Sequence, residues 1–112
     1  MSDELIRLSA TEAAAKLKAG EITPLDLIDA AEARIAAVDG DVNALPTLCL
    51  DRARDHARAL MAGKRREAEG EAGWLGGIPV AIKDLAEVAG VRTTYGSPIF
   101  ADYVPRESHP VV

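Results

Sequence analysis

The sequence predicts an α/β protein in which a helical region, residues 1–70, precedes the first strand or strands of a mixed sheet, in residues 71–112. Three observations predict this fold class. Apolar residues recur at helical spacing in the first region. A continuous apolar run, residues 78–82, is typical of a strand that is covered on both faces. Glycine and proline then follow at short intervals, which indicates a long, ordered loop.

The first predicted helix begins after Ser9 and ends near Gly20. Ser9 and Glu12 have the spacing of a capping box, in which the serine hydroxyl and the glutamate carboxylate each accept the backbone N–H of the other residue. Gly20 suits the left-handed backbone that ends many helices. Leu17 is the expected apolar anchor of this helix.

The second predicted helix opens at Thr23-Pro24, because proline is tolerated at the first helical position, where a backbone N–H has no helical partner. Asp39-Gly40 is its predicted end. Residues at helical spacing form its expected apolar stripe, namely Leu25, Ile28, Ala31, Ile35 and Val38.

The third predicted helix follows a loop or edge strand at residues 43–50, where Pro46 removes a backbone donor. Asp51 is expected to cap this helix, which runs into the charged residues 64–67. Those charges are expected to form a solvated face rather than a nucleic-acid site. Glycines at four positions between 70 and 77 then end the helical pattern.

The predicted strand at residues 78–82 lacks partners. A strand that is buried on both faces needs a neighbour on each side, because its backbone N–H and C=O groups must be hydrogen-bonded. The chain offers one convincing strand, whereas sheets usually contain several. We therefore expect residues 1–112 to be the N-terminal part of a single, larger domain, completed by the remainder of the chain or by a complementing chain.

Composition argues against several classes of function. The net charge of -5, from 13 Lys and Arg against 18 Asp and Glu, is not that of a nucleic-acid binder. Cys49 is the single cysteine and is expected in the core, His56 is expected at the surface, and His109 is expected to be a loop residue rather than a ligand, so no metal site is expected. No apolar run is long enough for a membrane span, and residues 1–7 lack a signal-peptide pattern, so we expect a cytoplasmic protein.

Lys83, directly after the predicted strand, is the candidate catalytic residue. Burial favours the neutral form of lysine, which can act as a base or a nucleophile. The plainer alternative is a lysine that extends to the surface and pairs with Asp84. A kinase-like interpretation of Val-Ala-Ile-Lys at residues 80–83 lacks the glycine-rich hairpin that it requires. A Ser–Lys dyad with Ser97 or Ser108 is a further alternative, although Ser97 suits a turn better.

A longer motif carries a specific resemblance. G-I-P-V-A-I-K-D at residues 77–84, followed by T-T-x-G-S at residues 93–97, resembles the amidase signature family, and weaker similarities extend over nearly the whole chain. The family hydrolyses carboxamides with a nucleophilic serine, a second serine on a cis peptide bond and a lysine, which corresponds to Lys83. The resemblance implies that neutral Lys83 accepts a proton from the second serine, and that no metal or cofactor takes part. Because the family places both serines beyond Val112, we expect residues 1–112 alone to be inactive.

The catalytic interpretation of Lys83 makes demands on its neighbours. We expect Ile82 and the apolar strand to desolvate the amine, and Asp84 to turn away from it and bond the backbone of the following loop. The polar residues of that loop are expected to fix its conformation, namely Thr93, Thr94 and Ser97.

The resemblance implies an amidohydrolase that converts a small-molecule amide into a carboxylate and ammonia; whether it forms a homo-oligomer is left open. One alternative is the A subunit of a tRNA-dependent amidotransferase, which is less favoured because Leu85 stands where that subunit more often has asparagine. The other is a truncated, non-catalytic interaction module.

Overall fold

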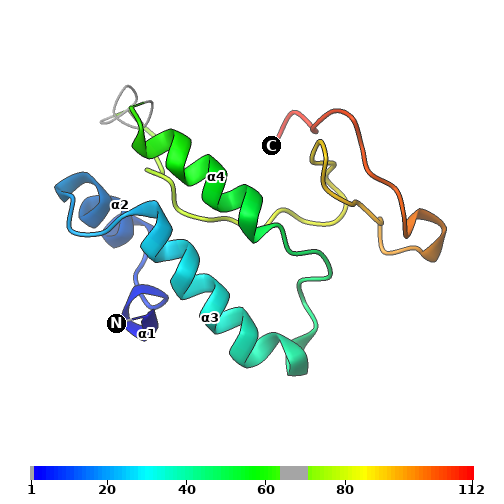
Figure 1. Ribbon diagram of the computed structural model, residues 1–112, viewed down its shortest axis with the longest axis horizontal. Helices are drawn as coiled ribbons and strands as arrows, with labels where there is room; N and C mark the ends of the chain where they lie inside the picture. Colours follow the sequence, from blue (N-terminus) through cyan, green and yellow to red (C-terminus); the bar gives the residue numbers. More distant parts are fainter. Residues whose placement is uncertain (1, 64–70) are drawn as a thin grey trace. The chain divides into compact units, whose positions relative to one another are not determined.

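A computed structural model of the chain describes residues 2–63 and 71–112 (Figure 1). The chain divides into two compact units, Met1–Pro79 and Val80–Val112. The first unit contains the helices α1 (Ser2–Leu5), α2 (Ala10–Ala19), α3 (Pro24–Val42) and α4 (Leu50–Met61). The second contains a short 3₁₀ helix, η2 (Pro98–Phe100), among loops and turns. The prediction of helices in the first part of the chain is confirmed.

Helix α2 has the predicted ends. The hydroxyl of Ser9 accepts the backbone N–H of Glu12 at 3.2 Å, and the backbone N–H of Ser9 donates to the Glu12 carboxylate at 2.8 Å. Gly20 ends the helix with a φ of 73°, in the left-handed region. Leu17 is fully buried, as expected of the anchor. Local residue types therefore determine both where this helix begins and where it ends.

Helix α3 begins as predicted but ends later. Thr23 forms a second capping box with Asp26, and Pro24 occupies the first turn. The helix continues through Gly40 to Val42 and ends at Asn43, whose φ of 53° is left-handed. The predicted end at Asp39-Gly40 is wrong because asparagine also tolerates the left-handed backbone that closes a helix.

The core of the first unit lies between α2 and α3. It is made of Ala13 and Leu17 from α2 and Leu27 from α3, and several half-buried residues pack against it: Leu5, Leu8, Ile22, Trp74 and Ile78. Of the predicted stripe on α3, Ile28 is buried, but Leu27 and Ala30 are buried as well. The stripe is wider than predicted because α3 contacts α1 and α4 as well as α2.

Helix α4 departs from prediction at its start. It begins at Leu50 after Cys49, whose side chain forms no cap and is exposed rather than in the core. Asp51 does not cap the helix but lies in its first turn, where the helix dipole favours a negative charge. His56 lies on the exposed face, as expected. The predicted continuation into residues 64–67 lies outside the described residues.

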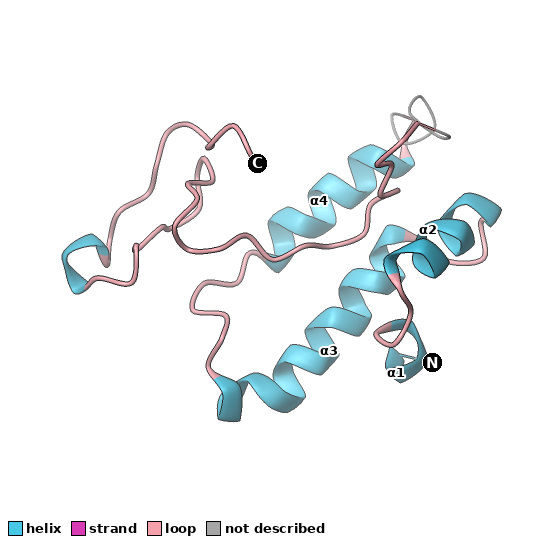
Figure 2. Ribbon diagram, turned by 180° about the vertical axis from the view of Figure 1, so that it is seen from behind, coloured by secondary structure: helices cyan, strands magenta, loops and turns pink. Residues whose placement is uncertain are grey.

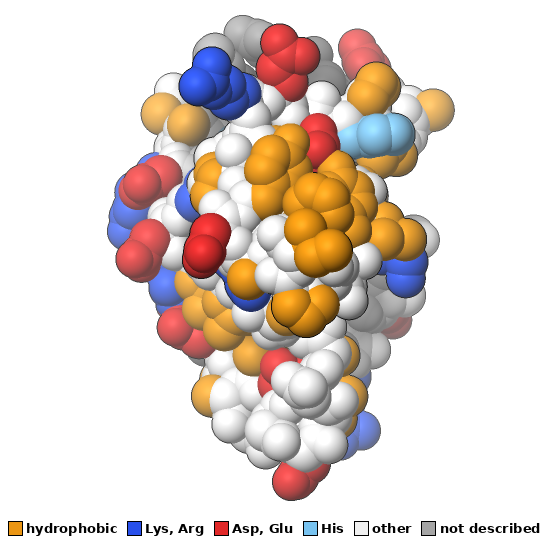
Figure 3. Space-filling model, turned by 90° about the vertical axis from the view of Figure 1, so that its right-hand side faces the viewer, with side chains coloured by type: hydrophobic (Ala, Val, Ile, Leu, Met, Phe, Trp, Pro, Cys, Tyr) orange, Lys and Arg blue, Asp and Glu red, His pale blue; other side chains and the backbone are white. Residues whose placement is uncertain are grey.

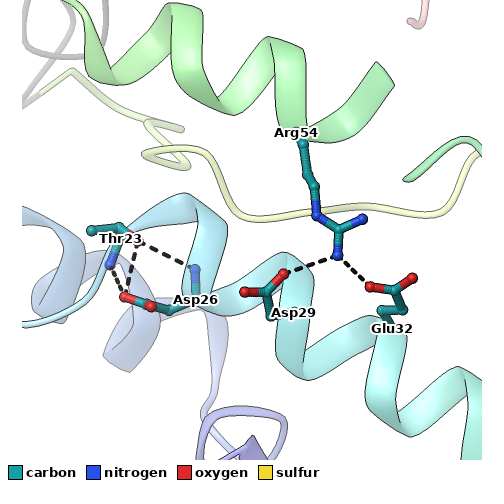
Figure 4. A network of polar contacts seen from close by, with 5 residues as sticks. All are labelled: Thr23, Asp26, Asp29, Glu32 and Arg54. Carbon is teal, nitrogen blue, oxygen red and sulfur yellow. Dashed lines mark hydrogen bonds and ion pairs between the residues drawn. The ribbon is translucent and has the colours of Figure 1, made fainter. Parts of the chain in front are cut away.

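An arginine braces α4 against α3 (Figure 4). Arg54 donates to the carboxylate of Asp29 at 2.9 Å and also to that of Glu32, one turn further along α3. The two carboxylates raise the pKa of the guanidinium, and the Arg54 side chain is 21% exposed. The brace therefore fixes the register of the two helices through polar contacts outside the core.

The described residues form no strand (Figure 2). Residues 78–82 are irregular, and the strand-like pairing in the described part is one bridge between Val88 and Val91. No described carbonyl accepts the backbone N–H of Val80 or Ile82, whose side chains are 65% and 42% exposed. The predicted sheet is thus absent from these residues, because an apolar run forms a strand only beside a partner.

Gly77 lies directly against the start of α3. Its φ is +96°, and a Cβ atom added there would lie 2.7 Å from Cγ of Pro24. Both the backbone conformation and the close approach therefore require glycine. Gly40, by contrast, lies within α3 with open space around it.

We predict that Gly77→Ala lowers the free energy of unfolding by about 1–3 kcal/mol, because alanine strains the backbone and displaces Pro24. Gly40→Ala is the matched control and should raise it by up to about 1 kcal/mol, since alanine is the better helix former. Urea denaturation followed by helical circular dichroism measures both. Equal stability of Gly77→Ala and the parent protein would contradict the close approach.

Candidate active site

Lys83 lies near the start of the second unit, where its carbonyl accepts the backbone N–H of Ala86 at 2.8 Å. Its side chain is exposed, and no described residue forms an ion pair with it. The expected desolvation by Ile82 and the apolar run is not observed. The reason is the missing sheet: Ile82 itself is exposed, so it does not cover the amine.

Asp84 turns to the following loop, as expected. Its carboxylate accepts the backbone N–H of Thr94 at 2.8 Å and also the Thr94 hydroxyl, and its carbonyl accepts the N–H of Tyr95 at 3.1 Å. The Thr94 hydroxyl lowers the pKa of the Asp84 carboxyl most, followed by the Thr94 N–H and the more distant charge of Arg92. Asp84 is therefore charged at neutral pH and engaged by Thr94 rather than by Lys83.

The two threonines of the T-T-x-G-S motif are buried, with exposed fractions of 2% for Thr93 and 8% for Thr94. The N–H of Thr93 donates to the carbonyl of Tyr103 at 3.0 Å, and its hydroxyl donates to the carbonyl of Val91 at 3.3 Å. The Thr94 hydroxyl also accepts the N–H of Gly96 at 3.2 Å. These bonds fix the loop, which confirms the role expected of both residues.

Both candidate serines serve local backbone. The Ser97 hydroxyl accepts the N–H of Ile99 at 3.3 Å and so caps η2, and the Ser108 hydroxyl accepts the N–H of Ala89 at 2.9 Å. No bond between either serine and Lys83 occurs in the part of the chain that the structure describes. The structure therefore brings no nucleophile to Lys83 from residues 80–112.

Sequence reasoning missed a cluster around Glu87. The hydroxyl of Tyr103 donates to the Glu87 carboxylate at 2.8 Å, and the hydroxyl of Tyr95 donates to the same oxygen. The Tyr95 ring lies 5.1 Å from that of Phe100 and 6.3 Å from that of Tyr103, measured between centroids. A signal was present, because three of the four aromatic residues of the chain fall within residues 95–103.

Hydrogen bonding in this cluster shifts the pKa values of its members. The tyrosine hydroxyls lower the pKa of the Glu87 carboxyl. The Glu87 carboxylate, with a smaller contribution from burial, raises the pKa of Tyr95 to about 12. The cluster thus links residue 87 to residues 95 and 103 of the following loop, just as Thr94 links that loop to residue 84.

Two kinds of site are not found in the described residues. No group of three or more His, Cys, Asp or Glu side chains there could hold a metal ion. His109 lies in a loop, as expected. None of the helices in residues 2–63 and 71–112 is long and apolar enough to cross a membrane. Lys83 is an exposed amine next to the loop that Asp84 and Thr94 brace.

Comparison with known proteins gives a family match. The family model described as amidase matches residues 26–112. The A subunit of the glutamyl-tRNA(Gln) amidotransferase from Anaeromyxobacter dehalogenans is 46% identical over 103 residues, which are 91% of this chain and 20% of that protein. Its counterparts in Streptomyces coelicolor and a Roseiflexus species are 41% identical over 94% and 44% identical over 90% of this chain, again across 20% of each relative. The chain spans about a fifth of the length of these relatives.

We predict that Glu87→Gln moves the pKa of Tyr95 from about 12 towards the ordinary tyrosine value of about 10. The reason is that a neutral amide, unlike the Glu87 carboxylate, does not repel the phenolate charge. NMR of labelled tyrosine rings during an alkaline titration measures this shift. Glu107→Gln, which removes an exposed carboxylate from the same loop, is the control and should leave Tyr95 unchanged. An unshifted Tyr95 in Glu87→Gln would show that Glu87 does not hold the cluster.

Proposed function

The chain belongs to the amidase family, and on this premise we propose that residues 1–112 are the N-terminal part of a single amidase domain whose catalytic lysine is Lys83. Within this domain, residues 1–70 are the helical region and residues 71–112 carry the strand and the lysine loop. The observation that carries the proposal is that the family match includes residues 77–84, with Lys83 beside a loop that Asp84 and Thr94 brace.

The proposed reaction hydrolyses the carboxamide of a small molecule to a carboxylate and ammonia. A serine attacks the carbonyl carbon, a second serine takes the proton of the nucleophile, and neutral Lys83 takes the proton of the second serine. The amide nitrogen takes a proton back through the same relay and leaves as ammonia. Water then attacks the acyl-serine, loses a proton through the relay, and releases the acid and the free serine. Residues 1–112 contribute the lysine, and no metal or organic cofactor enters the scheme.

We further propose that residues 78–82 become a strand of a mixed α/β sheet beside strands from the remainder of the chain or from a complementing chain. Hydrophobic side chains are prominent on the face that Figure 3 shows. The exposed hydrophobic side chains of the second unit are Val80, Ile82, Leu85, Ile99, Phe100, Tyr103, Val104, Val111 and Val112. So many exposed apolar side chains are typical of a surface that another segment covers. That cover would also desolvate Lys83.

A second candidate is the A subunit of an amidotransferase, because the relatives described above carry that name. Leu85 remains the sequence feature that favours a small-molecule amidase. The two candidates differ in what the full-length protein does by itself. An amidase releases ammonia from small amides without other proteins, whereas an amidotransferase component requires its partner chains and glutamyl-tRNA(Gln).

We predict that Lys83→Ala in the full-length protein lowers kcat/KM for a small amide by about 100- to 10,000-fold, the range for loss of an acid–base group. Lys83→Arg should not rescue activity, because guanidinium stays protonated. Lys18→Ala removes an exposed lysine from α2 and is the matched control, with unchanged activity. Ammonia release is the assay. A near-normal rate in Lys83→Ala would show that Lys83 is a surface residue without a catalytic role.

Residues 1–112 by themselves are predicted to hydrolyse no amide, because neither Ser97 nor Ser108 is placed to act with Lys83. Ammonia release by the purified chain measures this directly. Turnover that disappears in the Lys83→Ala variant of the same chain would contradict the prediction and support a self-contained site. Turnover that is the same in both would identify a contaminant.

A further inference from the structure

The sequence places a carboxylate beside the amine that the proposed mechanism needs in its neutral form. Asp84 follows Lys83 directly, and an opposite charge within about 4–6 Å favours the protonated form of lysine. A free Asp84 carboxylate would therefore oppose the use of Lys83 as a base. The structure shows how the chain deals with this conflict.

Thr94 engages both oxygens of the Asp84 carboxylate. One oxygen accepts the Thr94 N–H at 2.8 Å, and the other accepts the Thr94 hydroxyl. The hydroxyl is itself oriented, because its oxygen accepts the Gly96 N–H at 3.2 Å and its proton is thereby directed to Asp84. Thr94 is 8% exposed, so little water competes for these bonds.

The backbone adds a third link at the same point. The Tyr95 N–H donates to the carbonyl of Asp84 at 3.1 Å, so residues 94 and 95 together hold both the side chain and the main chain of residue 84. The main chain of Lys83 is held by the bond from Ala86. The backbone that carries Lys83 is thus fixed, while the neighbouring carboxylate is bonded to Thr94 and forms no ion pair with Lys83 in the described residues.

The other charges near this arrangement do not replace Thr94. Arg92 acts on Asp84 from the same loop and favours the charged carboxylate. Glu87, the next carboxylate along the chain, is engaged by Tyr95 and Tyr103 and is influenced by His109. Asp84 is the carboxylate directly next to Lys83 in sequence, so its release from Thr94 would act directly on the lysine.

We propose that Thr94 is a positioning residue of the active site, which holds the Asp84 carboxylate away from the Lys83 amine and so leaves the lysine free to lose its proton. The proposal rests on the proposed function, in which neutral Lys83 is the base. It assigns to the second threonine of the T-T-x-G-S motif a part in the chemistry, beyond fixing the loop.

Thr94→Val tests the proposal, because valine has the shape of threonine without its hydroxyl. Thr94→Ser is the conservative variant and keeps the donor. The double variant Asp84→Asn with Thr94→Val releases a neutral amide instead of a carboxylate. Asp84→Glu gives a second route to the same end should Thr94→Val fail to fold, since its longer carboxylate extends beyond the reach of Thr94.

Each variant is made in the full-length protein and given two measurements. Competitive acetylation, with Lys83 quantified by mass spectrometry across a pH series, reports protonation of the amine whether or not the enzyme turns over. The pH profile of kcat/KM for a small amide reports its use as a base. Thr94→Val should lower the acetylation rate of Lys83 near neutral pH about tenfold. It should also move the acidic limb of the profile to higher pH by about one pH unit, which is the same tenfold change.

The double variant and Thr94→Ser should both return to parental behaviour, and Asp84→Glu should resemble Thr94→Val. A merely structural role for Thr94 would leave the double variant as impaired as Thr94→Val, which would overturn the proposal. Unchanged acetylation of Lys83 in Thr94→Val and Asp84→Glu would also overturn it. Failure of the proposed function is distinguishable, since the parent would then release no ammonia while the acetylation of Lys83 still responded to Thr94.

Discussion

Every backbone N–H and C=O group that leaves water needs a partner, and the two units of this protein meet that demand differently. Helices pair these groups within their own segment, so α2 and α3 form from residues that are close in sequence. A strand pairs them only with another strand, and the described residues supply none for residues 78–82. The second unit is held by backbone bonds within its loops, such as that from Thr93 to Tyr103, and by side chains that bond backbone, as Thr94, Ser97 and Ser108 do.

Two carboxylates three residues apart organise the second unit. Asp84 gathers the donors of Thr94, and Glu87 gathers the hydroxyls of Tyr95 and Tyr103. Folding lowers the pKa of both carboxyls, so their contribution to stability is complete above the ordinary value of about 4 and is lost as the pH falls below it. The loop beside Lys83 is therefore most secure at neutral pH, where the proposed chemistry takes place.

The helices could be predicted because their signals lie in residues that are close in sequence. Features that depend on contacts between residues far apart in sequence could not. The capping boxes at Ser9 and Thr23 each lie within four residues, and the starts predicted for both helices are confirmed. The predicted end of α3 is wrong because Gly40 and Asn43 are both residue types that can end a helix, and the left-handed backbone is found at Asn43. Cys49 is exposed rather than in the core, and no feature of the residues around it in the sequence indicates this exposure. The Lys83 motif was recognisable, but its exposure depends on residues far from it in sequence.

The contact between Pro24 and Gly77 joins two positions that are 53 residues apart, and it links the choices open to each in evolution. A smaller residue at position 24 would remove the steric part of the barrier to a side chain at position 77. The positive φ at position 77 would still favour glycine or asparagine. Substitution is therefore ordered: position 24 can change first, position 77 only afterwards, and then to few residue types.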